Sequence, residues 1–324
     1  MIKKVLLGVL GLVGLAVVVA AAGLTWAHVA IRRERAALPS FEAVLAADSG
    51  ADRPVAVSWL NTASQAMPRA AVLDPGRDPH PRDPYVMSHP AFVLEWADGR
   101  KLLVDVGMTW EGAAAFGKPL EWLAGAAPIA PLSSVAQRLG KERGAVQGVI
   151  FTHLHTDHTG GITELCGRVG HPLRVFMTEA QEERPNFTTR PGLSAVRNAG
   201  CTRIERLSGG ALMAVPGFPG VFVIAAGGHT PGSQIVLAQV QSEDGVHRYA
   251  FTGDIVNNID GINANIPKPS LYRLLVVPED NARQDLLRRF LRELRDGRGF
   301  TLLVSHDQRE LEGSGVPAWH PAMP

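Results

Sequence analysis

Five histidines and two aspartates occur in short runs whose spacing suits metal binding. The densest run, THLHTDHTGG, covers residues 152–161. His153 and His155 follow an apolar, β-branched run, and side chains two residues apart on an extended chain point to the same side. The chain then turns, so Asp157 and His158 can reach a second point close to the first. This spacing predicts two neighbouring metal positions, and the glycines at 160 and 161 allow a tight turn into the next helix.

Three later segments each present one more candidate ligand directly after an apolar run. They are AGGHTPGS at 226–233, FTGD at 251–254 and VSHD at 304–307. Their candidate ligands are His229, Asp254 and His306. A single histidine is more often a hydrogen-bonded structural residue, but a set of this size indicates a metal centre. Neutral imidazole and carboxylate suit zinc, and also iron or manganese when several coordination positions stay open.

Strand and helix patterns around these motifs place them at strand ends. Apolar runs over 92–96 and 101–106 join through ADGR at 97–100, a hairpin signal because glycine accepts a positive φ. Helices are expected over 131–139 and over 281–295, the second with one buried apolar stripe. Further strands are expected at 146–152, 174–177, 221–225, 235–240, 247–252 and 300–304. This order predicts a layered α/β domain with sheets inside and helices outside.

The four segments, in this order, resemble the ligand motifs of the metallo-β-lactamase superfamily. LVDVG at 103–107 is similar to that family's first motif, whose acid supports the metal site by accepting hydrogen bonds, which gives Asp105 this role. The resemblance covers about two-thirds of the chain, from Ala91 to Asp307. It implies a four-layer αββα sandwich, preceded in this chain by an N-terminal hydrophobic helix.

The resemblance also implies a two-metal site, with zinc expected and iron or manganese as alternatives. His153, His155 and His229 would bind the first metal, Asp157, His158 and His306 the second, and Asp254 would bridge them. Two such ions about 3.5–4 Å apart can share a water and lower its pKa towards neutrality. Asp157 is the expected catalytic residue, because it can orient the hydroxide or pass a proton to the leaving group.

The ligand set predicts the reaction type better than the substrate. A full set of seven ligands is similar to the ligand sets of lactone hydrolases, glyoxalase-type thioesterases and organophosphate hydrolases of the superfamily. The β-lactamases with a similar GHTPGS stretch generally lack the bridging aspartate. We therefore expect cleavage of an ester, lactone or related bond. Organophosphate or β-lactam hydrolysis is the alternative, and an iron-dependent oxidoreductase of the same fold is the alternative from another class.

Apolar residues in two segments, 108–123 and 262–277, are candidates for the substrate walls, because loops above the metals form the pocket in this fold. These residues are Trp110, Phe116, Trp122 and Tyr272. Tyr272 is a candidate replacement for the tyrosine that lactonases often carry just after the bridging aspartate. Packing inside the core is the competing interpretation for all of them. Their character predicts a small, neutral and partly hydrophobic substrate.

Residues 1–35 are expected to form a membrane anchor or a signal segment. The apolar run from Val5 to Ile31 is long enough for a spanning helix, which needs about 20 residues. The alanines at 20–22 offer a cleavage site, so a secreted periplasmic protein is the alternative to an anchored one. Basic residues flank both ends of the run, and the favoured orientation exports the large domain to the periplasm.

The remaining chain divides into residues 36–90 and 91–324. The first is expected to be an extended, proline-rich entry region that packs on the domain, with a surface loop over 74–90. The second is the expected catalytic domain. A net charge of +1 gives no case for nucleic-acid binding, so the expected partners are a small-molecule substrate and the membrane. Cys166 and Cys201 can form a disulfide or remain two buried thiols.

Overall fold

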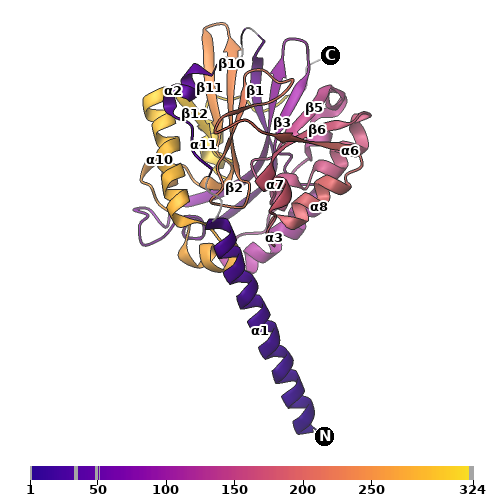
Figure 1. Cartoon of the computed structure of the whole chain (residues 1–324), viewed down its shortest axis with the longest axis vertical. Coiled ribbons are helices and arrows are strands. Elements are labelled where there is room, and N and C mark those ends of the chain that lie inside the picture. Colours follow the sequence, from indigo (N-terminus) through magenta and orange to yellow (C-terminus); the bar gives the residue numbers. More distant parts are fainter. Residues whose placement is uncertain (1, 33–35, 48–49, 51, 321–324) are drawn as a thin grey trace.

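Two β-sheets pack face to face, and helices cover both outer faces, in the computed structural model of the protein (Figure 1). The structure describes residues 2–32, 36–47, 50 and 52–320. The arrangement confirms the expected four-layer αββα sandwich with a preceding apolar helix.

The larger sheet has seven strands and the smaller one has five. In spatial order the first contains β4 (Ala130–Pro131), β1 (Pro54–Pro68), β2 (Pro84–Trp96), β3 (Lys101–Val104), β5 (Val146–Ile150), β6 (Leu173–Thr178) and β7 (Thr202–Leu207). The second contains β12 (Phe300–Leu303), β11 (Gly245–Phe251), β10 (Gln234–Ser242), β9 (Val221–Ala225) and β8 (Met213–Ala214).

The longer helices are α1 (Ile2–Arg32), α3 (Trp110–Ala124), α6 (Ile162–Val169), α8 (Arg190–Asn198) and α10 (Asn281–Arg298). The shorter ones are α2 (Phe41–Ala46), α4 (Val135–Leu139), α5 (Thr156–Thr159), α7 (Glu179–Glu183), α9 (Asp260–Asn263) and α11 (Gln308–Gly313). Three 3₁₀ segments are η1 (Arg69–Ala71), η2 (Gly140–Ala145) and η3 (Gly253–Ile255), and η4 (Tyr272–Val276) is π-helical.

Strand residues with period two build three separate layers of core. In β9, Val221 and Val223 point between the sheets, whereas Phe222 and Ile224 point outward onto the layer of α10. The opposite faces of a strand meet different partners because successive side chains alternate. The outer face of the seven-stranded sheet packs in the same way on α4, α6 and α8. Each sheet has apolar residues on both faces, so helices are needed to cover the two outer faces of the sandwich.

Parallel pairing brings the chemistry-bearing motifs to one edge of the sandwich. β3 pairs in parallel with β5, and β11 pairs in parallel with β12. The segments that follow these four strands carry Asp105, the 152–158 run, Asp254 and His306. Carboxyl ends of parallel strands lie together, so residues distant in sequence become neighbours.

The expectation of an extended entry region with a surface loop over 74–90 is wrong in part. Residues 54–68 form β1, which pairs with β2 along most of its length, and β2 itself begins at Pro84. Pro84 is the first residue of β2. Pro90 pairs with Asn61 of β1, and the register of the two strands shifts between Asn61 and Ser64. Proline is tolerated at both kinds of position because no ladder hydrogen bond is required from it there. Only residues 72–83 form the expected loop between strands.

Residues 108–123, expected as a loop, mostly form the helix α3. The Thr109 side chain accepts a hydrogen bond from the Gly112 N–H and caps the helix, and Gly125 ends it with a φ of 68°. Glycine suits that left-handed position because it has no Cβ. The aromatic residues of this segment are therefore spaced around a helix instead of along a loop.

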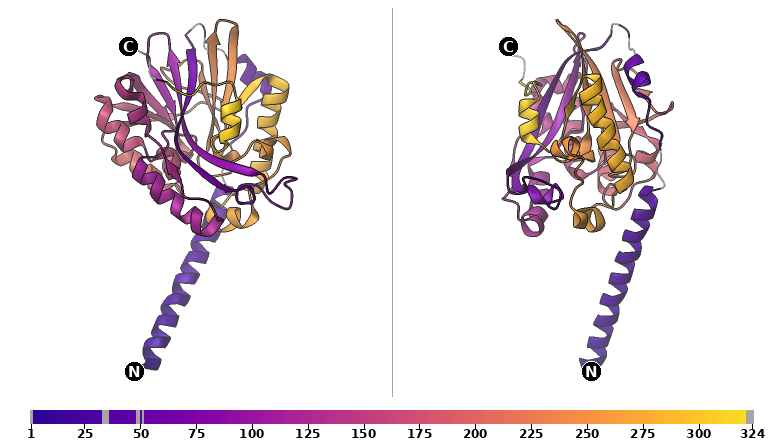
Figure 2. Two further views of the ribbon diagram at one scale, coloured as in Figure 1. Left: turned by 180° about the vertical axis from the view of Figure 1, so that it is seen from behind. Right: turned by 90° about the vertical axis from the view of Figure 1, so that its left-hand side faces the viewer.

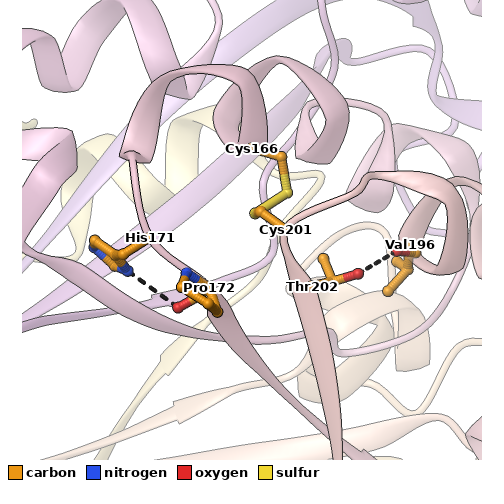
Figure 3. Close-up of a disulfide and its surroundings, with 6 residues drawn as sticks. All are labelled: Cys166, His171, Pro172, Val196, Cys201 and Thr202. Atoms are coloured by element: carbon orange, nitrogen blue, oxygen red, sulfur yellow. Dashed lines mark hydrogen bonds between the residues drawn. A yellow bond between two sulfur atoms is a disulfide. The ribbon is translucent and has the colours of Figure 1, made fainter.

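The two cysteines form a disulfide between the helix α6 and the residue that precedes β7 (Figure 3). The bridge joins Cys166 to Cys201, with the Cα atoms 5.3 Å apart. Beside it, the Thr202 hydroxyl donates a hydrogen bond of 2.6 Å to the Val196 carbonyl at the end of α8. The disulfide and this bond together fasten two helices to the edge of the seven-stranded sheet.

Replacing both cysteines with serine is expected to lower the free energy of unfolding by about 2–4 kcal/mol. The bridge closes a loop of 35 residues, and its loss gives the unfolded chain more conformational freedom. Chemical denaturation of the oxidised protein and of the double variant measures the difference. Equal midpoints and slopes would show that the bridge contributes nothing.

The helix α1 projects from one end of the domain (Figures 1 and 2). The most apolar 18-residue stretch within residues 8–32 has a mean hydropathy of 2.3, and none of that stretch is buried. Within the described residues this helix alone is long and apolar enough to cross a membrane or to act as a signal sequence. Its last turns contact the domain, because Ala27 and Ile31 are buried and His28 Nε2 lies 2.9 Å from the Leu274 carbonyl oxygen.

Candidate metal centre

Asp105 organises the run that follows β5. Its two carboxylate oxygens accept hydrogen bonds from the Thr152 N–H and the Thr152 hydroxyl, each at 2.8 Å. The same carboxylate lies 2.8 Å from Nδ1 of His158. Asp105 is fully buried and has a φ of 58°, a conformation that non-glycine residues adopt mainly where the surroundings enforce it. The contacts match the supporting role expected for this acid.

A first group of four side chains brings its polar atoms together beside this run. The group consists of His153, His155, His229 and Asp254, with one candidate ligand atom from each lying within 4.8 Å of the others. His153 Nε2 and His155 Nδ1 are 2.9 Å apart. His229 reaches the group from the loop between β9 and β10. All four side chains are buried or nearly so.

A second group lies on the other side of Asp254. Asp254, His158 and His306 form it, and the Nε2 atoms of the two histidines are 3.3 Å apart. Two nitrogens bound to one tetrahedral zinc at 2.0–2.1 Å are separated by about 3.3 Å. Asp157 joins this group, with Oδ2 at 3.4 Å from His306 Nε2 and 3.7 Å from His158 Nε2.

Asp254 lies between the groups and turns one oxygen to each. Oδ2 is 3.5 Å from His229 Nε2 and 3.8 Å from His153 Nε2. Oδ1 is 3.0 Å from His306 Nε2 and 3.2 Å from His158 Nε2. The short turn η3 that follows β11 holds the carboxylate in this place. A carboxylate so oriented can bind two cations at once.

Each of the five histidines has one ring nitrogen beside a partner outside the centre and turns the other nitrogen toward the centre. Nδ1 is the outer atom in four of them. It faces the Thr152 hydroxyl in His153 and the Asp105 carboxylate in His158. It faces the Glu279 carboxylate in His229 and the Ser88 carbonyl in His306. In His155 the outer atom is Nε2, which lies 3.0 Å from the Thr188 hydroxyl. An outer partner of this kind fixes the tautomer and directs a lone pair inward, as in metal-binding histidines.

Burial and charge also suit cations. Burial lowers the pKa of His155 to about 3, aided by His229, and burial lowers the pKa of His153 and His229 as well. These rings are therefore neutral and have lone pairs to donate. Burial opposes charge on His158 too, but Asp105 and then Asp157 raise its pKa well above the ordinary value. The second group thus attracts positive charge. In the first group, His229 Nε2 is a buried atom without a hydrogen-bond partner. The residues fit two divalent metal ions.

The sequence pattern of the metallo-beta-lactamase superfamily matches residues 84–306, more than half of the chain. The chain belongs to this superfamily. No curated protein sequence matches it, but solved structures of the same fold do. One is an N-acyl homoserine lactone hydrolase with N-hexanoyl-L-homoserine at its catalytic metal centre, with a TM-score of 0.56 at 16% identity, covering 81% of this chain and 96% of that one.

Two further solved structures have similar TM-scores. A B. thuringiensis protein with N-decanoyl-L-homoserine at its active site gives a TM-score of 0.57 at 16% identity, covering 81% of this chain and 96% of that one. A probable metal-dependent hydrolase from Staphylococcus aureus gives 0.56 at 16% identity, covering 79% and 91% of the two chains. At this identity the likeness shows the fold.

Beside the candidate ligands, the structure shows a buried pair of residues that the sequence analysis missed. Glu279 accepts a hydrogen bond of 2.6 Å from Nδ1 of His229. Lys268 donates to the same carboxylate at 2.9 Å and to the Asp254 carbonyl at 2.5 Å. Both side chains are almost completely buried, and Lys268 helps to lower the pKa of Glu279 against the effect of burial. Their positions carry no motif that could have identified them in advance.

Replacing Glu279 with glutamine is expected to weaken metal binding about 10–100-fold, the usual effect of losing an outer carboxylate partner of a ligand histidine. Glutamine keeps the size and one acceptor oxygen but removes the charge that Lys268 and His229 share. Competition with a chelator measures the affinity, and Glu293→Gln, on the exposed side of α10, is the matched control. Equal affinities in the two variants would contradict the role of Glu279.

His89, to which the sequence analysis gave no role, lies against Asp157. Its Nδ1 is 3.2 Å from Asp157 Oδ2, and its ring packs 5.0 Å from the ring of His306. The side chain is buried, and burial lowers its pKa while the bond to Asp157 opposes that effect. His89 therefore holds the expected catalytic aspartate from the strand β2.

The two glycines of the THLHTDHTGG run are needed because other backbone atoms lie close to their Cα atoms. Both have ordinary negative φ angles, −63° at Gly160 and −77° at Gly161. A Cβ at residue 161 would lie 2.4 Å from the Val106 carbonyl oxygen, and one at residue 160 would lie 2.7 Å from the Thr156 oxygen. The absence of side chains lets the segment after β3 pack on α5, which brings Asp105 to His158.

The four aromatic candidates for the substrate wall separate into two pairs. Phe116 is partly buried, and its ring lies 5.1 Å from the ring of His89. Tyr272 lies under Lys268, and burial together with Glu279, Asp254 and Asp157 raises the pKa of its hydroxyl well above the usual value. These two therefore border the centre. Trp110 and Trp122 are 58% and 79% exposed on α3, and their expected place in the wall is not supported.

Proposed function

We propose that this superfamily member is a two-metal hydrolase that cleaves ester or lactone bonds. The position of Asp254 between two groups of histidines carries the proposal, because it allows one carboxylate to serve two metals. His153, His155 and His229 would hold one ion, Asp157, His158 and His306 the other, and zinc is the metal we propose. When bound, the two ions would supply an activated water at neutral pH and polarise the scissile carbonyl.

The chain's own residues provide positioning and proton transfer. Asp157 Oδ2 is held by His89 and faces the second group, so this carboxylate can accept a proton and later deliver it to the leaving group. Tyr272 borders the same space, and its raised pKa keeps the hydroxyl protonated, so it can donate a hydrogen bond to the carbonyl oxygen of the substrate.

Two observations support an ester or lactone as the substrate class. Phe116 and Tyr272 give the centre apolar surface and a neutral donor, which suit an uncharged carbonyl compound. Structures of the same fold hold N-hexanoyl-L-homoserine and N-decanoyl-L-homoserine at their metal centre or active site.

The test is an acid-release assay with the full-length, zinc-loaded protein on lactones, aryl esters, thioesters, β-lactams and phosphotriesters. We expect turnover of lactones or esters, at rates well above those of the other classes. Turnover of phosphotriesters or β-lactams alone would reject the proposed bond class. No turnover by protein that carries two metals would reject hydrolysis and favour redox chemistry, which oxygen uptake by the iron-loaded protein would reveal.

We also propose that α1 anchors the protein and that the domain lies in the periplasm. A disulfide supports this location, since such bonds persist in oxidising compartments. A phosphatase that is active only in the periplasm, fused after Pro324, should be active in cells, whereas a fusion that works only in the cytoplasm should not. The reverse pattern would contradict the orientation.

A further inference from the structure

Exposed apolar side chains gather where α1 leaves the domain. They come from the end of α3, from the segment that contains η4, and from the chain before α8. The residues are Trp122, Leu123, Phe187, Leu271, Leu274 and Leu275, each at least half exposed and the largest fraction being 85% at Leu123. We call this set the basal patch. All three views of the ribbon place α3 and the orange-yellow segment that contains η4 at the end of the domain from which α1 projects (Figures 1 and 2).

A large exposed apolar area on a soluble domain usually marks a surface that binds something apolar. Here α1 continues from the same end of the domain with an apolar, unburied surface long enough to cross a bilayer. A bilayer that surrounds α1 would therefore meet the basal patch directly. Tryptophan is favoured at the membrane interface, and Trp122 and Trp26 are 79% and 65% exposed.

A cavity of about 780 Å³ lies between α1 and the domain beside this patch. Its apolar lining includes Leu24, Trp26, Ala27, Phe187, Pro231 and Leu275. Arg184 and Arg190 also line it, and cations at this level suit acidic lipid headgroups. The cavity is thus formed jointly by the spanning helix and by the loops of the catalytic domain.

The cavity adjoins the metal centre through two loops. Pro231 follows the candidate ligand His229 by two residues. Asn186, another lining residue, accepts a hydrogen bond of 2.7 Å from the Thr188 hydroxyl, which in turn contacts His155. The segment η4 connects the metal centre with the basal patch. Its residue Tyr272 borders the centre, and Leu274 and Leu275 are exposed in the patch.

We infer that the basal patch rests on the bilayer and that the cavity admits a substrate from it. The substrate class is an amphiphile with a long acyl chain and an ester or lactone head, and this part of the inference depends on the proposed function. The chain of the substrate would lie between α1 and the domain, and the head would reach the metal centre.

The first test measures contact with lipid and needs no activity. Full-length protein is placed in nanodiscs of phosphatidylcholine with bromine at the upper acyl carbons, which quenches nearby tryptophan fluorescence. Trp122→Phe should remove a quenched part of the emission. An unchanged quenched fraction would overturn the docking of the domain, whatever the activity.

The second test compares p-nitrophenyl acetate in solution with p-nitrophenyl palmitate in the same nanodiscs. Trp122→Ser/Leu123→Ser/Leu271→Ser should lower palmitate turnover about 10-fold and leave acetate turnover unchanged, because only the palmitate ester has to enter from the lipid on which the domain rests. Leu45→Ser/Val55→Ser, with partly exposed apolar residues on α2 and at the start of β1, is the matched control and should change neither rate.

The outcomes separate the two proposals. Equal losses on both substrates, or none on palmitate, would overturn entry from the bilayer. If the unaltered protein hydrolyses neither ester nor any lactone, the proposed function fails and the substrate class fails with it. The quenching result then still decides whether the domain docks on lipid.

Discussion

Replacing Asp254 with alanine is expected to lower kcat/KM at least about 10³-fold and to reduce the bound metal below two ions per chain. No other described carboxylate lies between the two histidine groups, so the change removes a charge from both. Kinetics and elemental analysis of the purified full-length variant measure the two effects.

Asp244→Asn is the matched control for that experiment. Asp244 lies beside β11, is exposed, and bonds only near the surface, with Ser242 and His247. It should keep full metal content and activity. If Asp254→Ala kept two ions and activity within a few-fold of the control, the bridging role of Asp254 would be wrong.

Replacing Asp157 with asparagine is expected to lower kcat about 10²–10⁴-fold with a smaller change in KM, the usual loss when a general acid or base is removed. Asparagine keeps the shape of the side chain and an oxygen that His89 can contact. It cannot take up or deliver the proton that the leaving group requires. Steady-state kinetics with an ester from the panel measure both parameters.

Asp307→Asn provides the comparison for Asp157→Asn. Asp307 is also buried and directly follows the candidate ligand His306. Its oxygens accept hydrogen bonds from the Ile259 N–H, just before α9, and from the Glu310 N–H in the first turn of α11. This variant should lose stability more than kcat. A kcat for Asp157→Asn within about threefold of the unaltered enzyme would remove Asp157 from the catalytic role.

Short apolar runs made much of the sandwich predictable from sequence. Strands such as β9 and β10 are apolar on both faces because one faces the other sheet and one faces helices. The hairpin of β2 and β3 was also confirmed, since Gly99 takes the positive φ that the turn needs. Helix α10 begins and runs as expected, because its apolar residues recur at helical spacing.

The first strand was missed for a physical reason. Thr62 and Gln65 are polar residues of β1 that are buried, where they hydrogen-bond the His89 and Ala127 carbonyls. The strand also shifts register beside them, so its pattern never follows a simple period of two. Tertiary contacts, which a local pattern does not contain, decide the conformation of this segment.

The candidate site likewise contains residues that could be named from the sequence and residues that could not. The seven proposed ligands could be named from the sequence because four lie in one run and the others follow strands in recognisable short motifs. The residues that hold them were largely missed. Glu279 and His89 reach their partners His229 and Asp157 across 50 and 68 residues, and neither lies in a recognisable motif. Asp105 was found only because it belongs to a motif of its own.

A crystal structure of the full-length protein with zinc, phased and mapped at the zinc absorption edge, tests the two-metal centre most directly. We expect two anomalous peaks, one among His153, His155 and His229 and one among Asp157, His158 and His306, with Asp254 in contact with both. A single peak, or two peaks that Asp254 does not join, would contradict the centre proposed here.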